Sequence, residues 1–258
     1  MSRFVFQDAV ERFIVALEDA LLLDIEAGRV NARKASQRGS SGGGLNVESR
    51  AIYRAIAVMS VAAWEDFNEQ LVMAGFNHLK KSSSGVPANL EKWFPVKDLQ
   101  SPGPFHVRKL YWAYFNLDPM PSWWFSFAAR ARDIGVDADW WAAFNDPREI
   151  EHRTRRGEDA AKWLDSLVKL RHATAHQDRR HFQQEPELGV ATRNRGSWGA
   201  TRYTAQNSIA VVTQLALCTV GALSQHLSCA GELRYSRALR SWQLSGSSLN
   251  ELPQWPSS

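Results

Sequence analysis

The residues best suited to chemistry lie in one basic stretch, KLRHATAHQDRR, at positions 169–180. Arg171 and His176 stand five positions apart there, and His172 lies one helical turn before His176. An arginine binds a phosphate through two parallel hydrogen bonds and stabilises charge that builds in a transition state. A histidine transfers protons near neutral pH. In RNA cleavage, Arg171 would hold the phosphate, and His176 would move a proton to or from a ribose 2′-OH or a leaving 5′-oxygen.

Two other interpretations of this stretch stay open. Basic side chains are favoured at the C-terminal end of a helix by the helix dipole, so the stretch could be a solvated helix end without chemistry. His172 and His176 also have the spacing of two metal ligands on one helix face. Asp178 is too close along the chain to be a convincing third ligand, and the RNA interpretation needs no metal and no cofactor.

An acidic residue far upstream bears on the same question. Glu65, in the sequence AAWEDF, falls on an apolar side of the most strongly helical segment, together with Val61 and Val72. A carboxylate on an apolar stripe needs a partner, and Arg171 is the candidate. Alternatively, Glu65 lies at the wet edge of its helix or pairs with a surface base.

The elements that position these residues are expected to be helices. Apolar residues recur at three- and four-residue steps in an N-terminal helix, which we expect Gly28 to end. The segment 46–79 is apolar on most faces and predicts a central buried helix, with Asn46 as a possible cap. The expected organisation is an N-terminal helix, a Gly/Ser-rich linker, a helical domain and a polar tail, at residues 1–35, 36–45, 46–230 and 231–258.

The helical domain contains a Trp-rich insertion at about residues 82–157, which holds most of the prolines. It predicts short helices joined by proline turns, with its aromatic side chains in the core rather than on a binding platform. A clear helix follows at 158–176. Turn signals near 183–203 are compatible with a hairpin, and an apolar helix at 207–227 closes the domain. The predicted fold class is an all-α helical bundle.

Composition sets broad limits on the class of protein. The chain has 258 residues, 44% of them hydrophobic, with 11 Trp and a formal net charge of +4, so it can bury a core and tolerates an anionic partner. Two cysteines, Cys218 and Cys229, are too few for a disulfide framework. The N-terminus is unlike a secretory signal, and we expect no apolar run long enough for a membrane helix. These features predict a cytoplasmic protein.

The two motifs together resemble the HEPN superfamily, most closely its RiboL-PSP-HEPN type. A long apolar helix carries the Trp64-Glu65 pair, and a much later helix ends in the segment from Arg171 to His176. The residue after the arginine is normally polar in that family, often Asn, and here it is His172. The resemblance covers about residues 46–230, although the Trp-rich insertion has no counterpart that we can align.

The resemblance implies a helical bundle that forms a homodimer, in which two motif-bearing helix ends meet across the two-fold axis in one composite RNA site. It further implies a metal-independent endoribonuclease that leaves a 2′,3′-cyclic phosphate, acting as a toxin or in phage defence with an antitoxin or defence-system partner. Some members only bind RNA or dimerise, and that is the alternative for this chain. Arg179, Arg180 and the RTRR segment at 153–156 would steer RNA by their charge, or would alternatively form a solvated basic surface without a ligand.

Overall fold

The computed structural model describes residues 4–38, 47–81, 102–126, 154–175, 200 and 202–229. These residues are mostly helical, which confirms the expected all-α class. The elements are α1 (Gln7–Arg38), α2 (Val47–Lys81), α3 (Pro104–Phe115), the short 3₁₀ helix η2 (Met120–Ser122), β1 (Trp124–Ser126), β2 (Thr154–Arg156), α6 (Glu158–Ala175) and α7 (Arg202–His226).

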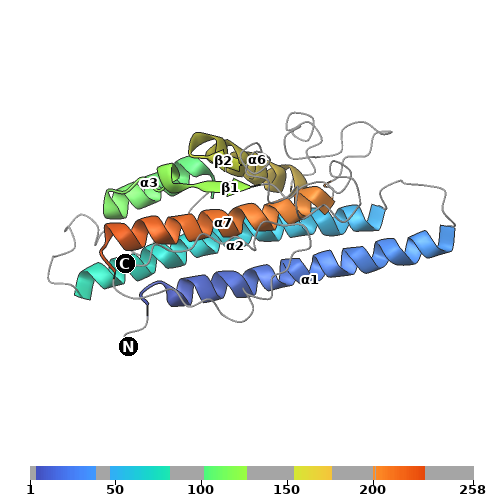
Figure 1. Ribbon diagram of the computed structural model, residues 1–258, viewed down its shortest axis with the longest axis horizontal. Helices are drawn as coiled ribbons and strands as arrows, with labels where there is room; N and C mark the ends of the chain where they lie inside the picture. The colour runs from blue at the N-terminus through green and yellow to red at the C-terminus, as the bar shows by residue number, and fades with distance from the viewer. Residues whose placement is uncertain are drawn as a thin grey trace, which may run out of the picture.

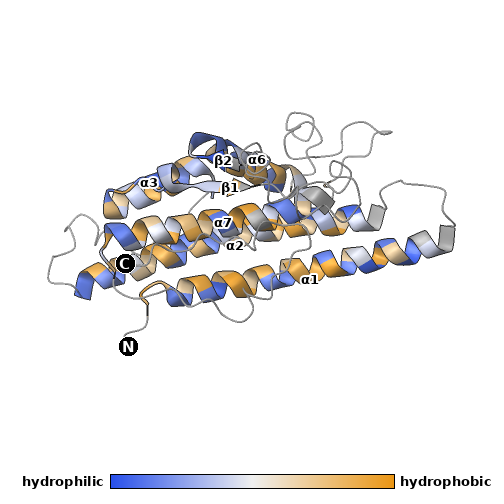
Figure 2. Cartoon of the chain, viewed as in Figure 1, coloured by the Kyte–Doolittle hydropathy of each residue, from blue (hydrophilic) through white to orange (hydrophobic). Residues whose placement is uncertain are grey.

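The helices form three layers around α2 and α7, which run side by side through the middle of the molecule (Figure 1). The long helix α1 packs along one side of this pair, mainly on α2. The elements α3, β1, β2 and α6 cover the other side. Apolar and polar stretches alternate along the outer helix α1, because it turns one face towards its neighbours (Figure 2).

The helix α1 is longer than the sequence led us to expect, because it continues through Gly28 to Arg38. Contacts in its second half explain the difference. Asn31 donates a hydrogen bond from Nδ2 to the hydroxyl of Tyr53 on α2 at 2.9 Å, and it accepts one from the hydroxyl of Ser49. Tertiary bonds of this kind outweigh the weak helix propensity of one glycine. The first residues of the expected linker are therefore helical, and residues 39–45 lie outside the described part.

The buried central helix predicted at 46–79 is confirmed as α2, although Asn46 lies outside the described residues. Its aromatic side chains reach both outer layers. Phe67 packs against Phe13 of α1 with ring centroids 4.9 Å apart, and Trp64 meets Trp123, beyond α3, edge to face at 6.0 Å. Contacts on opposite sides explain why α2 has apolar residues on most of its faces.

The Trp-rich insertion contains α3, η2, β1 and β2 among its described residues, so short helices are present as predicted but the strands were not foreseen. Strands β1 and β2 pair antiparallel, with Trp124 opposite Arg156 and Ser126 opposite Thr154. Residues 154–156 of the RTRR segment therefore form a strand before α6. The possible hairpin near 183–203 lies almost wholly outside the described residues.

The last helix, α7, begins five residues earlier than expected. It is also longer and more apolar than expected, because we expected no apolar run long enough for a membrane helix. By length and composition, its stretch Thr204–His226 is the one candidate membrane span among the described residues. However, 82% of its most apolar window is buried inside the protein. Packing against α2 accounts for the apolar composition, as in the central helix of a bundle.

Candidate functional site

Glu65 and Arg171 form an ion pair that joins α2 to α6. Arg171 donates a hydrogen bond from Nη1 to Oε2 of Glu65 at 2.6 Å. The side chain of Arg171 is 29% exposed, and that of Glu65 is 23% exposed. The sequence hypothesis that Arg171 is the partner of Glu65 is confirmed. Neither side chain has another partner among the described residues. The remaining guanidinium donors of Arg171 therefore stay available to a ligand.

The helix α6 positions Arg171 through its buried face. Trp163, Leu164, Leu167 and Leu170 are all at most 3% exposed and fix the rotation of the helix on the core. The helix begins after Gly157, whose φ of +51° is a left-handed conformation that glycine adopts without strain. Glu158 and Asp159 lie in its first turn, where the helix dipole favours negative charge. Arg171 thus lies just before the last turn of a helix that is packed firmly on the core.

The structure describes only one of the two histidines of the motif, His172. His172 is exposed in the last turn of α6, next to Arg171, and the structure does not place it in the ion pair. His176 lies outside the described residues. On a straight helix, position 176 would lie about 140° around the axis from position 171. The two side chains can therefore converge only if the chain turns after Ala175 or if a second chain supplies one of them.

One further polar group lies on the same helix turn as Arg171. The hydroxyl oxygen of Thr174 is buried and has no hydrogen-bond partner among the residues that the structure describes. Thr174 follows Arg171 by three positions, a spacing that puts two side chains on the same side of a helix. A buried hydroxyl without a partner is costly. Nothing in the sequence pattern marked Thr174 as a candidate site residue.

Trp64, the residue before Glu65, has a structural role. It is fully buried, and its indole N–H donates a hydrogen bond to the backbone carbonyl of Pro102 at 3.0 Å. Pro102 and Gly103 directly precede α3, so this bond fixes the beginning of α3 against α2 beside the Glu65–Arg171 pair. The Trp64-Glu65 dipeptide therefore connects three helices, with Trp64 holding α3 and Glu65 holding α6.

The rest of α3 is fixed at several further points. The hydroxyl of Tyr111 donates to Oδ1 of Asn68 on α2 at 3.1 Å, and burial raises the pKa of Tyr111 well above its usual value, which keeps this donor protonated. Nε2 of His226 on α7 donates to the carbonyl of Phe115 at 2.8 Å. These bonds make α3 a rigid element.

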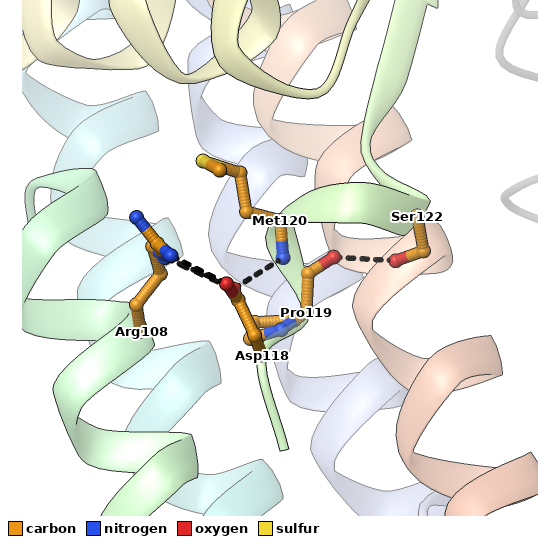
Figure 3. A network of polar contacts seen from close by, with 5 residues as sticks. All are labelled: Arg108, Asp118, Pro119, Met120 and Ser122. Atoms are coloured by element: carbon orange, nitrogen blue, oxygen red, sulfur yellow. Dashed lines mark hydrogen bonds and ion pairs between the residues drawn. The ribbon is translucent and has the colours of Figure 1, made fainter.

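A polar network after α3 completes this attachment (Figure 3). Arg108 donates to both carboxylate oxygens of Asp118, and Oδ1 of Asp118 also accepts a hydrogen bond from the backbone N–H of Met120 at 3.0 Å. Asn116 turns the chain with a left-handed φ of 54°. The network positions Trp123, whose indole N–H donates to Thr219 on α7 at 2.9 Å.

The insertion holds exposed aromatic residues that the sequence analysis assigned to the core. Most of its described aromatic side chains are buried, as expected, but Phe105 is 71% exposed and Trp112 is 59% exposed. Both belong to α3. The sequence did contain a signal for an exposed aromatic face. The two rings are seven positions apart, Lys109 lies between them, and the helix has no acidic residue.

Other chemistry-bearing groups are few in the described part of the molecule. It contains no cluster of three or more His, Cys, Asp or Glu side chains placed to hold a metal ion. Cys218 and Cys229 are free thiols, and burial raises the pKa of each to about 11. A thiol with that pKa is protonated at neutral pH and is a poor nucleophile. Comparison with protein-family models, curated proteins and solved structures found no match to this chain.

Proposed function

We propose that this protein is a HEPN-type endoribonuclease that cleaves RNA without a metal ion, as a toxin or phage-defence effector. The observation that carries the proposal is the half-buried Glu65–Arg171 ion pair at the end of α6. An arginine held by one carboxylate, with its other N–H groups available, is suited to bind a phosphate. The resemblance of the Trp64-Glu65 and Arg171-to-His176 motifs to the HEPN superfamily supports the same function.

In the proposed reaction, a ribose 2′-oxygen attacks the neighbouring phosphorus while a histidine accepts the 2′-OH proton. The bond from phosphorus to the 5′-oxygen breaks, and the leaving oxygen takes up a proton. The products are a 2′,3′-cyclic phosphate and a 5′-hydroxyl. His176 is the proton carrier in this scheme, and Arg171 stabilises the extra negative charge on the phosphate in the transition state.

Glu65 acts in this scheme as a positioning residue. Its carboxylate bonds to Nη1 of Arg171 and fixes the orientation of the planar guanidinium. The same contact compensates much of the cost of a half-buried arginine charge. His172, one residue further on the exposed side of α6, would orient the phosphate or serve as a second proton carrier.

The proposed site is composite, built from two copies of the chain in a homodimer. This arrangement is compatible with α6, because residues 171 and 176 of one straight helix would point in different directions and a second copy is one of the two ways to bring them together. Two motif-bearing helix ends that meet across a two-fold axis would bring an Arg171 of one copy near a His176 of the other. Sedimentation of the purified protein at several concentrations would measure the dimer.

The direct test is an RNA cleavage assay in EDTA with wild type, His176→Ala and Arg171→Ala in parallel. We expect wild type to cleave and both variants to be inactive while they remain folded by circular dichroism. Intact RNA of every substrate class after long incubation with wild-type dimer would rule out the proposal. RNA binding without cleavage, unchanged in His176→Ala, would instead assign the non-catalytic RNA-binding module. Stoichiometric zinc in the purified protein would support the His172/His176 metal site.

A further inference from the structure

The exposed face of α3 combines aromatic rings with positive charge. Phe105 and Trp112 are more than half exposed, and Lys109 lies between them, four positions after the first and three before the second. These spacings put all three side chains on one side of the helix. The two rings are separated by about 10 Å along the axis, from the helical rise of 1.5 Å per residue.

Among the described residues, α3 itself offers no negative charge to oppose an anionic ligand. The helix α3 contains no aspartate or glutamate, and Lys109 has no ion-pair partner in the described part of the chain. The nearest carboxylate along the chain, Asp118, is neutralised by Arg108. His106 lies at the same end, with its ring 5.4 Å from that of Phe105.

The other exposed apolar residues provide a contrast. Val15, Leu22 and Ile25 are also more than half exposed, but all are aliphatic and all belong to α1. Glu26, next to Ile25, is paired with Arg29 and Arg33. The stretch of α1 around Val15 is acidic, with Asp8, Glu11, Glu18 and Asp19 against a single Arg12. It would repel a polyanion, whereas the α3 face would attract one.

The position of α3 links this face to the Arg171 site. The hydrogen bond from Trp64 to Pro102 attaches the N-terminal end of α3 to the residue that precedes Glu65, the partner of Arg171. Phe105 lies in the first turn, near that end. Contacts further along, from Tyr111 to Asn68 and from Gly75 to Phe115, show that α3 then follows α2 away from the pair. The start of α3 therefore lies nearer the pair than its end does, and a strand that ran from Arg171 along α3 would meet Phe105 before Trp112.

We propose that this face of α3 is a stacking platform for single-stranded RNA, in which Phe105 and Trp112 each stack on a base and Lys109 binds the intervening phosphate. Single-stranded nucleic acid fits these side chains because its unpaired bases expose flat apolar surfaces while its backbone is anionic. Duplex bases are already stacked and do not fit. The inference rests on the proposed RNA substrate and identifies the single-stranded form as the one bound.

The test measures binding separately from cleavage. The probe is a fluorescently labelled 2′-O-methyl oligouridylate of about 12 nucleotides, a length within the usual site sizes for single strands. It lacks the 2′-OH nucleophile, so the proposed chemistry cannot cut it. Anisotropy titrations compare wild type with Phe105→Ala, Trp112→Ala, the conservative Trp112→Phe, and Leu22→Ala as a matched loss of exposed apolar surface on α1.

Each alanine substitution on α3 is expected to weaken binding about tenfold, as loss of one stacked base does elsewhere. Trp112→Phe should bind within about threefold of wild type, because a stacking ring remains. Leu22→Ala should also bind within about threefold, because it leaves the α3 platform unchanged. Lys109→Ala should lower the slope of log Kd against log salt concentration by about 0.7, the value for one phosphate contact on a single strand. A duplex probe should show no dependence on either ring.

Wild-type affinity in both Phe105→Ala and Trp112→Ala would overturn the platform. If those two variants also changed the sedimentation of the protein, the face would belong to a protein interface instead. The outcomes separate the two proposals. Loss of binding in a protein that never cuts RNA would preserve the platform and remove the nuclease. Normal binding by both aromatic variants in a protein that does cut RNA would preserve the nuclease and remove the platform.

Discussion

The two sides of α2 use polar contacts in different ways. On the α1 side, Asn31 bonds to both Ser49 and Tyr53 through its two amide atoms. On the α6 side, Arg171 uses one guanidinium nitrogen on Glu65 and has no other partner among the described residues. The first arrangement ties one helix to another. The second leaves donors that a ligand can use, which is why the candidate site lies on the α6 side.

The largest expected difference between the two sides is in RNA cleavage. Arg171→Ala should reduce cleavage at least about 100-fold, because it removes a donor that stabilises transition-state charge. Asn31→Ala removes a comparable contact on the α1 side and should leave cleavage unchanged while lowering the free energy of unfolding by about 1–2 kcal/mol. Single-turnover rates and urea denaturation measure these quantities. Equal cleavage rates in the two variants would remove the distinction between the two sides.

The packing of the inner layers can be tested at a second position on α2. A Cβ added to Gly75 would lie 2.9 Å from Cζ of Phe115 on α3 and 3.4 Å from Cδ2 of Leu223 on α7. Gly75→Ala should therefore destabilise the protein by about 1–3 kcal/mol, the usual cost of overpacking a core. Urea denaturation measures it. An unchanged midpoint would mean that α3 moves freely on α2, which contradicts the rigid attachment described above.

The buried thiol of Cys218 on α7 should make the stability of the protein depend on pH in the alkaline range. Burial raises the pKa of Cys218 from 9.0 to about 11, so the folded state retains a proton that the unfolded state loses as the pH rises through 9. Stability should therefore fall from pH 9 to pH 11, by about 1 kcal/mol at pH 10. Comparing wild type with Cys218→Ala in urea at pH 8 and pH 10 isolates this contribution. The same loss in both proteins would assign the effect to other groups, such as Tyr111.

The smallest predicted effect is on α1, where the helix has free space. Nothing lies within 4 Å of a Cβ placed on Gly28, and the residue is within a continuous helix. Gly28→Ala should stabilise the protein by about 0.4–1 kcal/mol, because alanine has less freedom to lose on folding. Thermal unfolding measures the sign. A destabilised Gly28→Ala would show that α1 requires a bend or a close neighbour at this position.

The sequence predicted those features that depend on local periodicity. The buried helix α2 and the long helix that carries Arg171 follow from apolar spacing, and the Glu65–Arg171 pair follows from the cost of an unpartnered carboxylate on an apolar stripe. The continuation of α1 through Gly28 depends on Asn31, Ser49 and Tyr53, which lie far apart along the chain. Pairing of β1 with β2 is also long-range, because 27 residues separate Ser126 from Thr154.

Burial of individual aromatic residues could not be predicted from their density in the sequence. Tyr111 and Trp112 are neighbours in α3, yet the first is fully buried and the second is 59% exposed. The difference arises from the rotation of α3, which the Trp64–Pro102 and Tyr111–Asn68 hydrogen bonds fix. These bonds join segments about 40 residues apart, so only the folded chain distinguishes a core ring from a surface ring.

The chemical nature of the RNA ends tests the central claim most directly. Wild-type protein is incubated with RNA in EDTA, and the products are analysed by mass spectrometry. The proposed attack of a ribose 2′-oxygen, with Arg171 holding the phosphate, predicts fragments with 2′,3′-cyclic phosphate and 5′-hydroxyl ends that are absent from Arg171→Ala reactions. Fragments with 3′-hydroxyl and 5′-phosphate ends, or cleavage that persists in Arg171→Ala, would contradict this account.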